Sequence, residues 1–208
     1  MARLSRSRRL SLIALFTALA IVLNLVIAIP APYEPFLLYE VWEVPILLAV
    51  LILGFWDGTT VAVLNTLLLE AYRPGALPIA PFYNLAAQLS MFAGVLPVDR
   101  AGRKRAWEGR RLVPAATAAG AALRTGVMTV VNAIVIPLPY PVGFGSGLFP
   151  LTQADVPGLL VPIGAFNFTI ALYTIPLAYT LARAIESRYG RIFRGAGEVG
   201  AEGPARSR

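Results

Sequence analysis

Residues 10–29 read LSLIALFTALAIVLNLVIAI, a run of 20 residues without a charged side chain. An α-helix of that length spans about 30 Å, the thickness of the hydrocarbon core of a bilayer, so the run predicts a transmembrane helix. Four arginines precede it: Arg3, Arg6, Arg8 and Arg9. Such a basic flank also precedes a secretory signal peptide. Here no convincing small-x-small cleavage site follows, and Pro30 and Pro32 end the run, which favours a helix that is retained.

The composition of the whole chain agrees with this interpretation. Of 208 residues 57% are apolar and 14% are charged, and the charged share is roughly half that of a soluble globular protein. The absence of cysteine and histidine excludes disulfides, thiol nucleophiles, Ser-His triads and the commonest metal ligands. A net charge of +7 could indicate nucleic acid, but the basic residues flank the apolar runs instead of forming their own face. That arrangement is typical of membrane topology.

Five further apolar runs predict an all-α, polytopic membrane protein with six transmembrane helices and cytoplasmic N and C termini. The runs cover about residues 44–55, 59–72, 81–96, 115–136 and 156–184. Asp57-Gly58 is expected to form the turn between the second and third helices. The six-helix domain would cover residues 10–185. A basic cytoplasmic segment, 1–9, precedes it, and a basic, disordered cytoplasmic tail, 186–208, follows it.

The number of spans rests on the distribution of charge. The second and third helices are short, and one kinked span in their place would give five. Six spans put the three arginine-rich segments in the cytoplasm: the N-terminus, the loop after the fourth helix and the C-terminus. Of 18 lysines and arginines, only Arg73 then lies in an outer loop, which satisfies the positive-inside rule. Arg124 lies within the fifth helix and is expected to extend its side chain to the cytoplasmic surface.

Carboxamide side chains recur at one predicted depth. Asn24, Asn84, Gln88, Asn132 and Asn167 all fall in the outer half of the membrane, at a rise of 1.5 Å per residue. An amide donates and accepts hydrogen bonds without carrying charge, so several amides around one cavity suit a planar, polar, uncharged heterocycle. The alternative is that each amide only ties two helices together.

Two shorter features also suggest contacts. The loop before the second helix carries Tyr39, Glu40, Trp42 and Glu43. This loop could be a lid over the cavity or an ordinary interfacial aromatic belt. On the first helix, Ala14 and Ala18 have the small-xxx-small spacing that lets another helix approach closely, although an alanine-rich helix produces this spacing easily by chance.

The sequence contains no catalytic constellation. Glu70 and Asp155 are isolated carboxylates, and no glycine-rich phosphate loop follows a strand, so ATP is not expected to bind this chain. A membrane enzyme would need nucleophiles or carboxylates converging at one depth, where this chain has amides. We therefore expect a protein that is not an enzyme.

Four stretches of the chain match a known family. They are the Ala14-xxx-Ala18 spacing, the acidic loop Tyr39 to Glu43 leading into Pro45, the stretch RTGVMTVVN at 124–132 followed by IPLPY at 136–140, and the pair Phe166-Asn167. On these stretches, and over about residues 10–185, the chain resembles the S component of energy-coupling-factor (ECF) vitamin transporters, most closely the riboflavin-specific branch. The third stretch is the most specific, with Met128 four residues before Asn132 and Pro137 five residues after it.

The resemblance implies a function. An S component binds its vitamin from outside, docks through the alanine face of its first helix on a transmembrane coupling subunit, and relies on two cytoplasmic ATPases for release. Asn132 and Asn167 match family residues that hydrogen-bond the flavin ring, and riboflavin would be a substrate, with no cofactor expected. Ile170 stands where the family usually has lysine, and Glu43 where aspartate is common. A different vitamin or heterocycle, or a membrane subunit without a ligand, therefore remain the alternatives.

Overall fold

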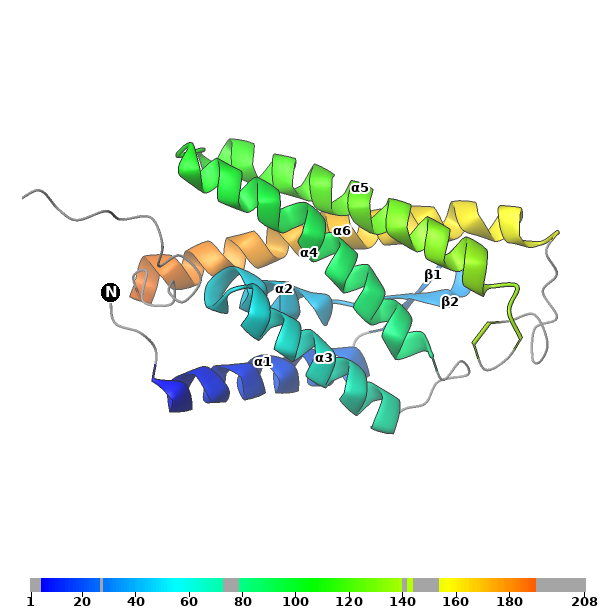
Figure 1. Cartoon of the computed structure of the whole chain (residues 1–208), viewed down its shortest axis with the longest axis horizontal. Helices are drawn as coiled ribbons and strands as arrows, with labels where there is room; N and C mark the ends of the chain where they lie inside the picture. The colour runs from blue at the N-terminus through cyan, green and yellow to red at the C-terminus, as the bar shows by residue number, and fades with distance from the viewer. Residues whose placement is uncertain (1–4, 27, 73–78, 140–141, 144–153, 190–208) are drawn as a thin grey trace, which may run out of the picture.

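The computed structural model describes residues 5–26, 28–72, 79–139, 142–143 and 154–189. Within these ranges the chain forms six α-helices and a two-stranded antiparallel hairpin (Figure 1). The helices are α1 (Arg6–Val26), α2 (Glu43–Leu53), α3 (Phe55–Tyr72), α4 (Ala80–Lys104), α5 (Gly109–Val135) and α6 (Val156–Tyr189). The six predicted helices are therefore confirmed as helices, and the fold is all-α apart from the hairpin.

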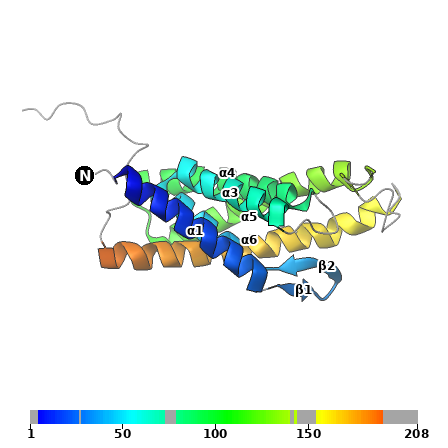
Figure 2. The ribbon, with the colours of Figure 1, turned by 90° about the horizontal axis from the view of Figure 1, so that it is seen from below.

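The hairpin corrects the expected end of the first helix. We predicted a helix up to Ile29, whereas α1 ends at Val26, and β1 (Ile29–Ala31) pairs with β2 (Glu34–Tyr39). Proline disfavours helical geometry in the residue before it, so Pro30 and Pro32 force Ile29 and Ala31 into extended conformations. The hairpin continues beyond the far end of α1 and lies beside α6 (Figure 2).

The turn between α2 and α3 lies earlier than expected. It falls at Gly54, whose φ of +103° is open to glycine and unfavourable for other residues. The predicted turn at Asp57-Gly58 was wrong, because Asp57 sits in the first turn of α3. There its carboxylate interacts favourably with the helix dipole and pairs with Arg9 of α1.

The helices α4 and α5 are longer than predicted. We expected them to be joined by a basic loop over residues 97–114, but only 105–108 separate them. Helix α4 continues through Pro97, and its basic last turn is stabilised by the helix dipole and by Arg103 pairing with Asp99 one turn earlier. Likewise α6 continues past the predicted domain boundary at residue 185. The expected loop at 73–75, most of the glycine-rich stretch 143–150 and the tail from 190 lie outside the described residues.

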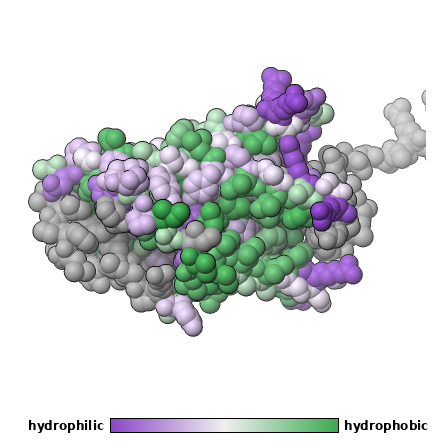
Figure 3. Space-filling view, turned by 180° about the vertical axis from the view of Figure 1, so that it is seen from behind, coloured by the Kyte–Doolittle hydropathy of each residue, from purple (hydrophilic) through white to green (hydrophobic). Residues whose placement is uncertain are grey.

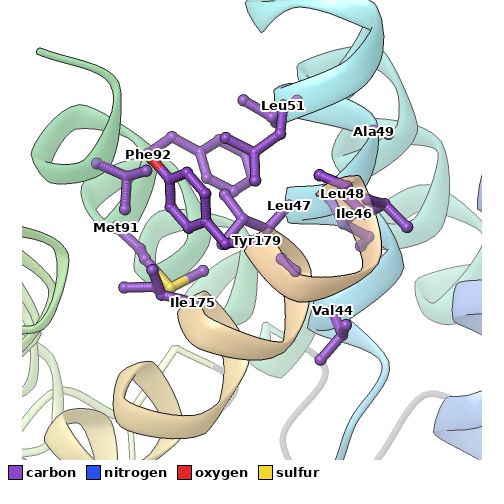
Figure 4. Packing of buried hydrophobic residues seen from close by; sticks show 14 of the residues in the cluster. Val44, Ile46, Leu47, Leu48, Ala49, Leu51, Met91, Phe92, Ile175 and Tyr179 are labelled. Carbon is purple, nitrogen blue, oxygen red and sulfur yellow. The ribbon is translucent and has the colours of Figure 1, made fainter. Parts of the chain in front are cut away.

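Helix α2 forms the centre of the bundle. Every residue from 43 to 52 is buried, because α2 packs against α1, α3 and α6. A helix that is apolar on all sides is stable only when other helices surround it. Its side chains meet Met91 and Phe92 of α4 and Ile175 and Tyr179 of α6 (Figure 4). Helix α5 completes the bundle by packing against both α4 and α6.

The outer surface of the bundle is suited to lipid. Large apolar side chains are exposed on several helices, including Leu15, Val130, Ile134 and Val161. On one face hydrophobic residues form a broad patch with strongly hydrophilic residues at one end (Figure 3). Three helices, at 6–26, 109–135 and 156–188, are long and apolar enough to cross a bilayer. The start of α1 and the end of α6 lie at the same end of the bundle (Figures 1 and 2).

Helices α4 and α5 cross closely at two glycines. A Cβ atom on Gly94 would lie 2.4 Å from the backbone oxygen of Ala119, and one on Gly120 would lie 2.6 Å from the Cδ1 atom of Ile175. Small residues at such crossings let helix backbones approach in a membrane, where packing replaces the hydrophobic effect as the driving force. These two glycines therefore set the spacing of α4, α5 and α6.

We predict that Gly94→Ala destabilises the bundle. The new methyl group would collide with rigid backbone, so the free energy of unfolding should fall by about 1–3 kcal/mol, as is usual for overpacking. The matched control is Gly126→Ala in α5, where a Cβ meets nothing within 4 Å and where alanine favours the helix. Thermal unfolding of both variants in detergent checks this, and equal stability of the two would contradict it.

Candidate functional site

A buried ion pair joins α2 to α5 inside the bundle, and a hydrogen bond from it reaches α6. Glu43, in the first turn of α2, and Arg124 of α5 are 3% and 2% exposed. Both terminal guanidinium nitrogens of Arg124 donate to the carboxylate, Nη2 to Oε1 at 2.9 Å and Nη1 to Oε2. The third donor, Nε, reaches Oδ1 of Asn167 on α6 at 3.1 Å. The expectation that Arg124 extends to the cytoplasmic surface was wrong, because a bidentate partner at its own depth satisfies its charge.

The amide of Asn167 is held from two sides. Its Oδ1 accepts from Arg124, and its Nδ2 donates to the backbone oxygen of Ile163 at 3.0 Å. On the neighbouring α4, the Sδ atom of Met91 lies 4.0 Å from Nη1 of Arg124. The polar cluster is thus enclosed by α2, α4, α5 and α6.

The loop after the hairpin is fastened to α1 and α6. Nε1 of Trp42 donates to Oε2 of Glu40 at 2.7 Å, and Nδ2 of Asn24 approaches the same oxygen at 3.4 Å. The hydroxyl of Tyr173 on α6 donates to the backbone oxygen of Glu40 at 2.6 Å. Together with Glu43, these contacts hold the predicted lid residues against the body of the bundle.

Aromatic side chains of the hairpin lie along α6. The Tyr39 hydroxyl is 2.8 Å from Oγ1 of Thr169, and the Tyr39 ring lies 5.1 Å from that of Phe166, centroid to centroid. Tyr33 hydrogen-bonds Tyr39 at 2.5 Å.

The other predicted amides, Asn132, Asn84 and Gln88, differ in burial and in hydrogen-bond partners. Asn132 is half-buried and donates to the backbone oxygen of Met128 at 2.7 Å. Asn84 is half-buried, and its backbone oxygen accepts from Nε2 of Gln88 at 3.3 Å. Gln88 is 0% exposed, yet its Oε1 has no partner among the described residues. Because Gln88 precedes Met91 by three residues, both share the face of α4 that is turned to Arg124.

The two alanines of the predicted docking motif face away from the core. Ala14 and Ala18 are exposed, and so is Leu15 between them. The buried side of α1 is formed by Ile13, Phe16, Thr17, Ala20 and Asn24. The motif is therefore available to another helix in this structure.

The sequence analysis did not identify Arg124 and Met91 of the polar cluster, or Tyr173 beside Glu40, as site residues. Arg124 offered a signal, since a charge inside a span requires a partner. The acidic residues that could pair with it belong to other helices, and the sequence does not indicate which of them contacts Arg124. Across the described residues, no three acidic, histidine or cysteine side chains gather as metal ligands.

We predict that the ion pair behaves as a unit. Arg124→Met alone leaves Glu43 buried without its counter-charge and should lower the free energy of unfolding by about 3–5 kcal/mol. Adding Glu43→Leu should restore most of that loss, since an apolar pair of similar volume replaces both charges. Thermal unfolding in detergent followed by tryptophan fluorescence measures both. A double variant no more stable than Arg124→Met would refute the coupling.

Comparison with known proteins addresses the fold. No protein-family profile and no curated protein sequence matches the chain. Among solved structures, it is similar to the S component of a bacterial ECF transporter, with a TM-score of 0.72 and 22% sequence identity. The match covers 88% of this chain and 98% of that one. The chain therefore has the fold of an ECF transporter S component.

Proposed function

We propose that this chain is the substrate-binding S component of an ECF-type vitamin importer, capturing riboflavin or a related flavin from outside. The observation that carries the proposal is the fold, which is shared over 98% of a known S component. The protein would act as a transport subunit of the cell membrane and not as an enzyme, and partner subunits would hydrolyse ATP.

The charge distribution supports six spans with both termini in the cytoplasm. The basic residues at 6–9, 100–111 and 183–188 lie near the start of α1, the α4–α5 connection and the end of α6. With six spans these three segments share one side of the membrane, as the positive-inside rule requires. The opposite end of the bundle, where α5 ends and α6 begins, then faces outside.

The ligand is assigned to the region between the Arg124–Glu43 pair and that outer end. Within the part of the chain that the structure describes, the buried Oε1 of Gln88 has no donor, an arrangement that costs free energy unless something else supplies one. Asn132 lies eight residues outward from Arg124 on the same face of α5. Tyr39 and Phe166 supply aromatic surface from the hairpin and α6. Amides and aromatic rings together suit a flat, uncharged heterocycle.

Riboflavin is the first candidate because the residues Asn132 and Asn167 match the riboflavin-specific branch. The position where that branch usually has lysine is occupied by Ile170, which is buried and offers no charge. The substrate proposed for this chain therefore includes related flavins and other neutral heterocycles.

One observation favours the alternative of a membrane subunit without a ligand. Asn132 and Asn167 each donate to the backbone oxygen four residues earlier in their own helix, as packing residues would. Measuring whether the protein binds riboflavin distinguishes a substrate-binding subunit from a membrane subunit without a ligand.

We predict that the protein purified in detergent binds riboflavin and quenches its fluorescence. Gln88→Leu and Asn132→Ala should each weaken the affinity about tenfold, the value of one hydrogen bond. The matched control is Asn65→Ala, which removes a buried carboxamide of α3 that also has no partner among the described residues. This variant should bind normally. A protein that does not quench riboflavin would reject the flavin, and equal losses in all three variants would indicate packing defects.

The proposed partners are a transmembrane coupling subunit and two cytoplasmic ATPases. The exposure of Ala14 and Ala18 supports docking through α1, because small side chains allow a partner helix to approach closely. No nucleic acid is involved.

We predict that Ala14→Trp or Ala18→Trp blocks uptake by the assembled transporter and leaves ligand affinity unchanged. A bulky ring on this face would hold the partner helix away without disturbing the core. Ala118→Trp, at an exposed alanine of α5 at a similar distance along its helix, serves as the control and should transport normally. If the α1 variants lost ligand binding as well, α1 would be part of the core of the site.

A further inference from the structure

The guanidinium of Arg124 presents only donors to its surroundings. Its two terminal nitrogens are taken by Glu43, so the planar fork is fixed and Nε is directed at α6. Nε lies 3.1 Å from the side chain of Asn167. Because a guanidinium cannot accept a hydrogen bond, the atom of Asn167 that faces it must be the oxygen.

The other half of the Asn167 amide is fixed by its own helix. Nδ2 donates to the backbone oxygen of Ile163 at 3.0 Å, and that oxygen can only accept. Rotating the amide by 180° would set its NH2 against Nε–H of Arg124 and its oxygen against the Ile163 oxygen. Both contacts would become repulsive, so a single orientation is allowed.

We propose that Arg124 is a positioning residue that makes Asn167 a hydrogen-bond donor toward the ligand. An amide NH2 carries two hydrogens, and Ile163 takes one, which leaves one N–H for a bound molecule. The ligand must therefore present an acceptor, a carbonyl oxygen or an unprotonated ring nitrogen, at this point. This inference rests on the proposed function as a binding subunit and specifies the class of its substrate.

The same arrangement selects against other ligands. An ammonium group, which has only donors, would meet the N–H of Asn167 and the guanidinium behind it. On α4, by contrast, Oε1 of Gln88 is a buried acceptor without a partner among the described residues, and it requires a donor. A ligand that carries both a carbonyl and an N–H, such as a cyclic amide or imide, offers the acceptor that Asn167 needs and the donor that Gln88 needs.

The test uses the full-length protein in detergent and the double variant Arg124→Met with Glu43→Leu, which removes both charges together. The first measurement needs no ligand. In protein labelled with 15N-asparagine, the side-chain NH2 signal of Asn167 is identified by its loss in Asn167→Ala. Its heteronuclear NOE should be that of a rigid group in the wild type and should fall in the double variant.

The second measurement is a ratio of affinities. Riboflavin is compared with 2-thioriboflavin and 4-thioriboflavin, in which sulfur, a weak acceptor, replaces one carbonyl oxygen. The wild type should prefer riboflavin over one of the thio compounds by about tenfold, and the double variant should lose that preference. A merely structural role would weaken all three ligands equally. The control, Arg9→Met with Asp57→Leu, removes the ion pair between α1 and α3 and should keep the preference.

The outcomes separate the two levels of the proposal. A rigid Asn167 amide and an unchanged preference in the Arg124–Glu43 double variant would overturn the positioning role. If riboflavin does not bind at all, the proposed flavin function fails, and the Asn167 signal alone then supports or overturns the role of Arg124.

Discussion

The buried pair of Glu43 and Arg124 is the constraint on which the rest of the bundle depends. Each charge would be costly in an apolar interior without the other, so the pair persists only where α2 and α5 bring them into bidentate contact. That contact fixes the depth at which α2 begins relative to α5. Through Asn167 it fixes α6 in the same register. Displacing any of the three helices along its axis would separate buried charges or unpair a buried amide.

The depth of Glu43 explains why α2 is short. Its 11 residues span about 16 Å, roughly half of a bilayer core. The hairpin and the loop up to Trp42 lie beside α6 next to the start of α2, and strand pairing and the hydroxyl of Tyr173 satisfy polar backbone groups there.

Much of this architecture could be predicted from local sequence. The six apolar runs predicted six helices because length and hydropathy are properties of each segment alone. The wrong predictions concern places where a contact between residues far apart in the sequence determines the structure. Arg124 and Glu43 are 81 residues apart, so the pairing that buries Arg124 has no local signal. Helix α4 continues past Pro97 because Asp99 pairs with Arg103 and also accepts from Tyr179 of α6 at 3.0 Å. The shared depth of the amides stays a prediction, and the partners of Asn132 and Asn167 were not accessible from the sequence.

The balance of charge in the cluster bears on what the bundle can bind. One guanidinium and one carboxylate neutralise each other at close range, and their hydrogen-bonding atoms are directed at each other and at Asn167. A charged ligand group placed there would add a third buried charge without a counter-ion, at a cost of several kcal/mol. A neutral group meets only amides and aromatic rings. Under the proposed function, the ion pair that holds the helices together would also favour an uncharged ligand, and stability and specificity would then have the same physical origin.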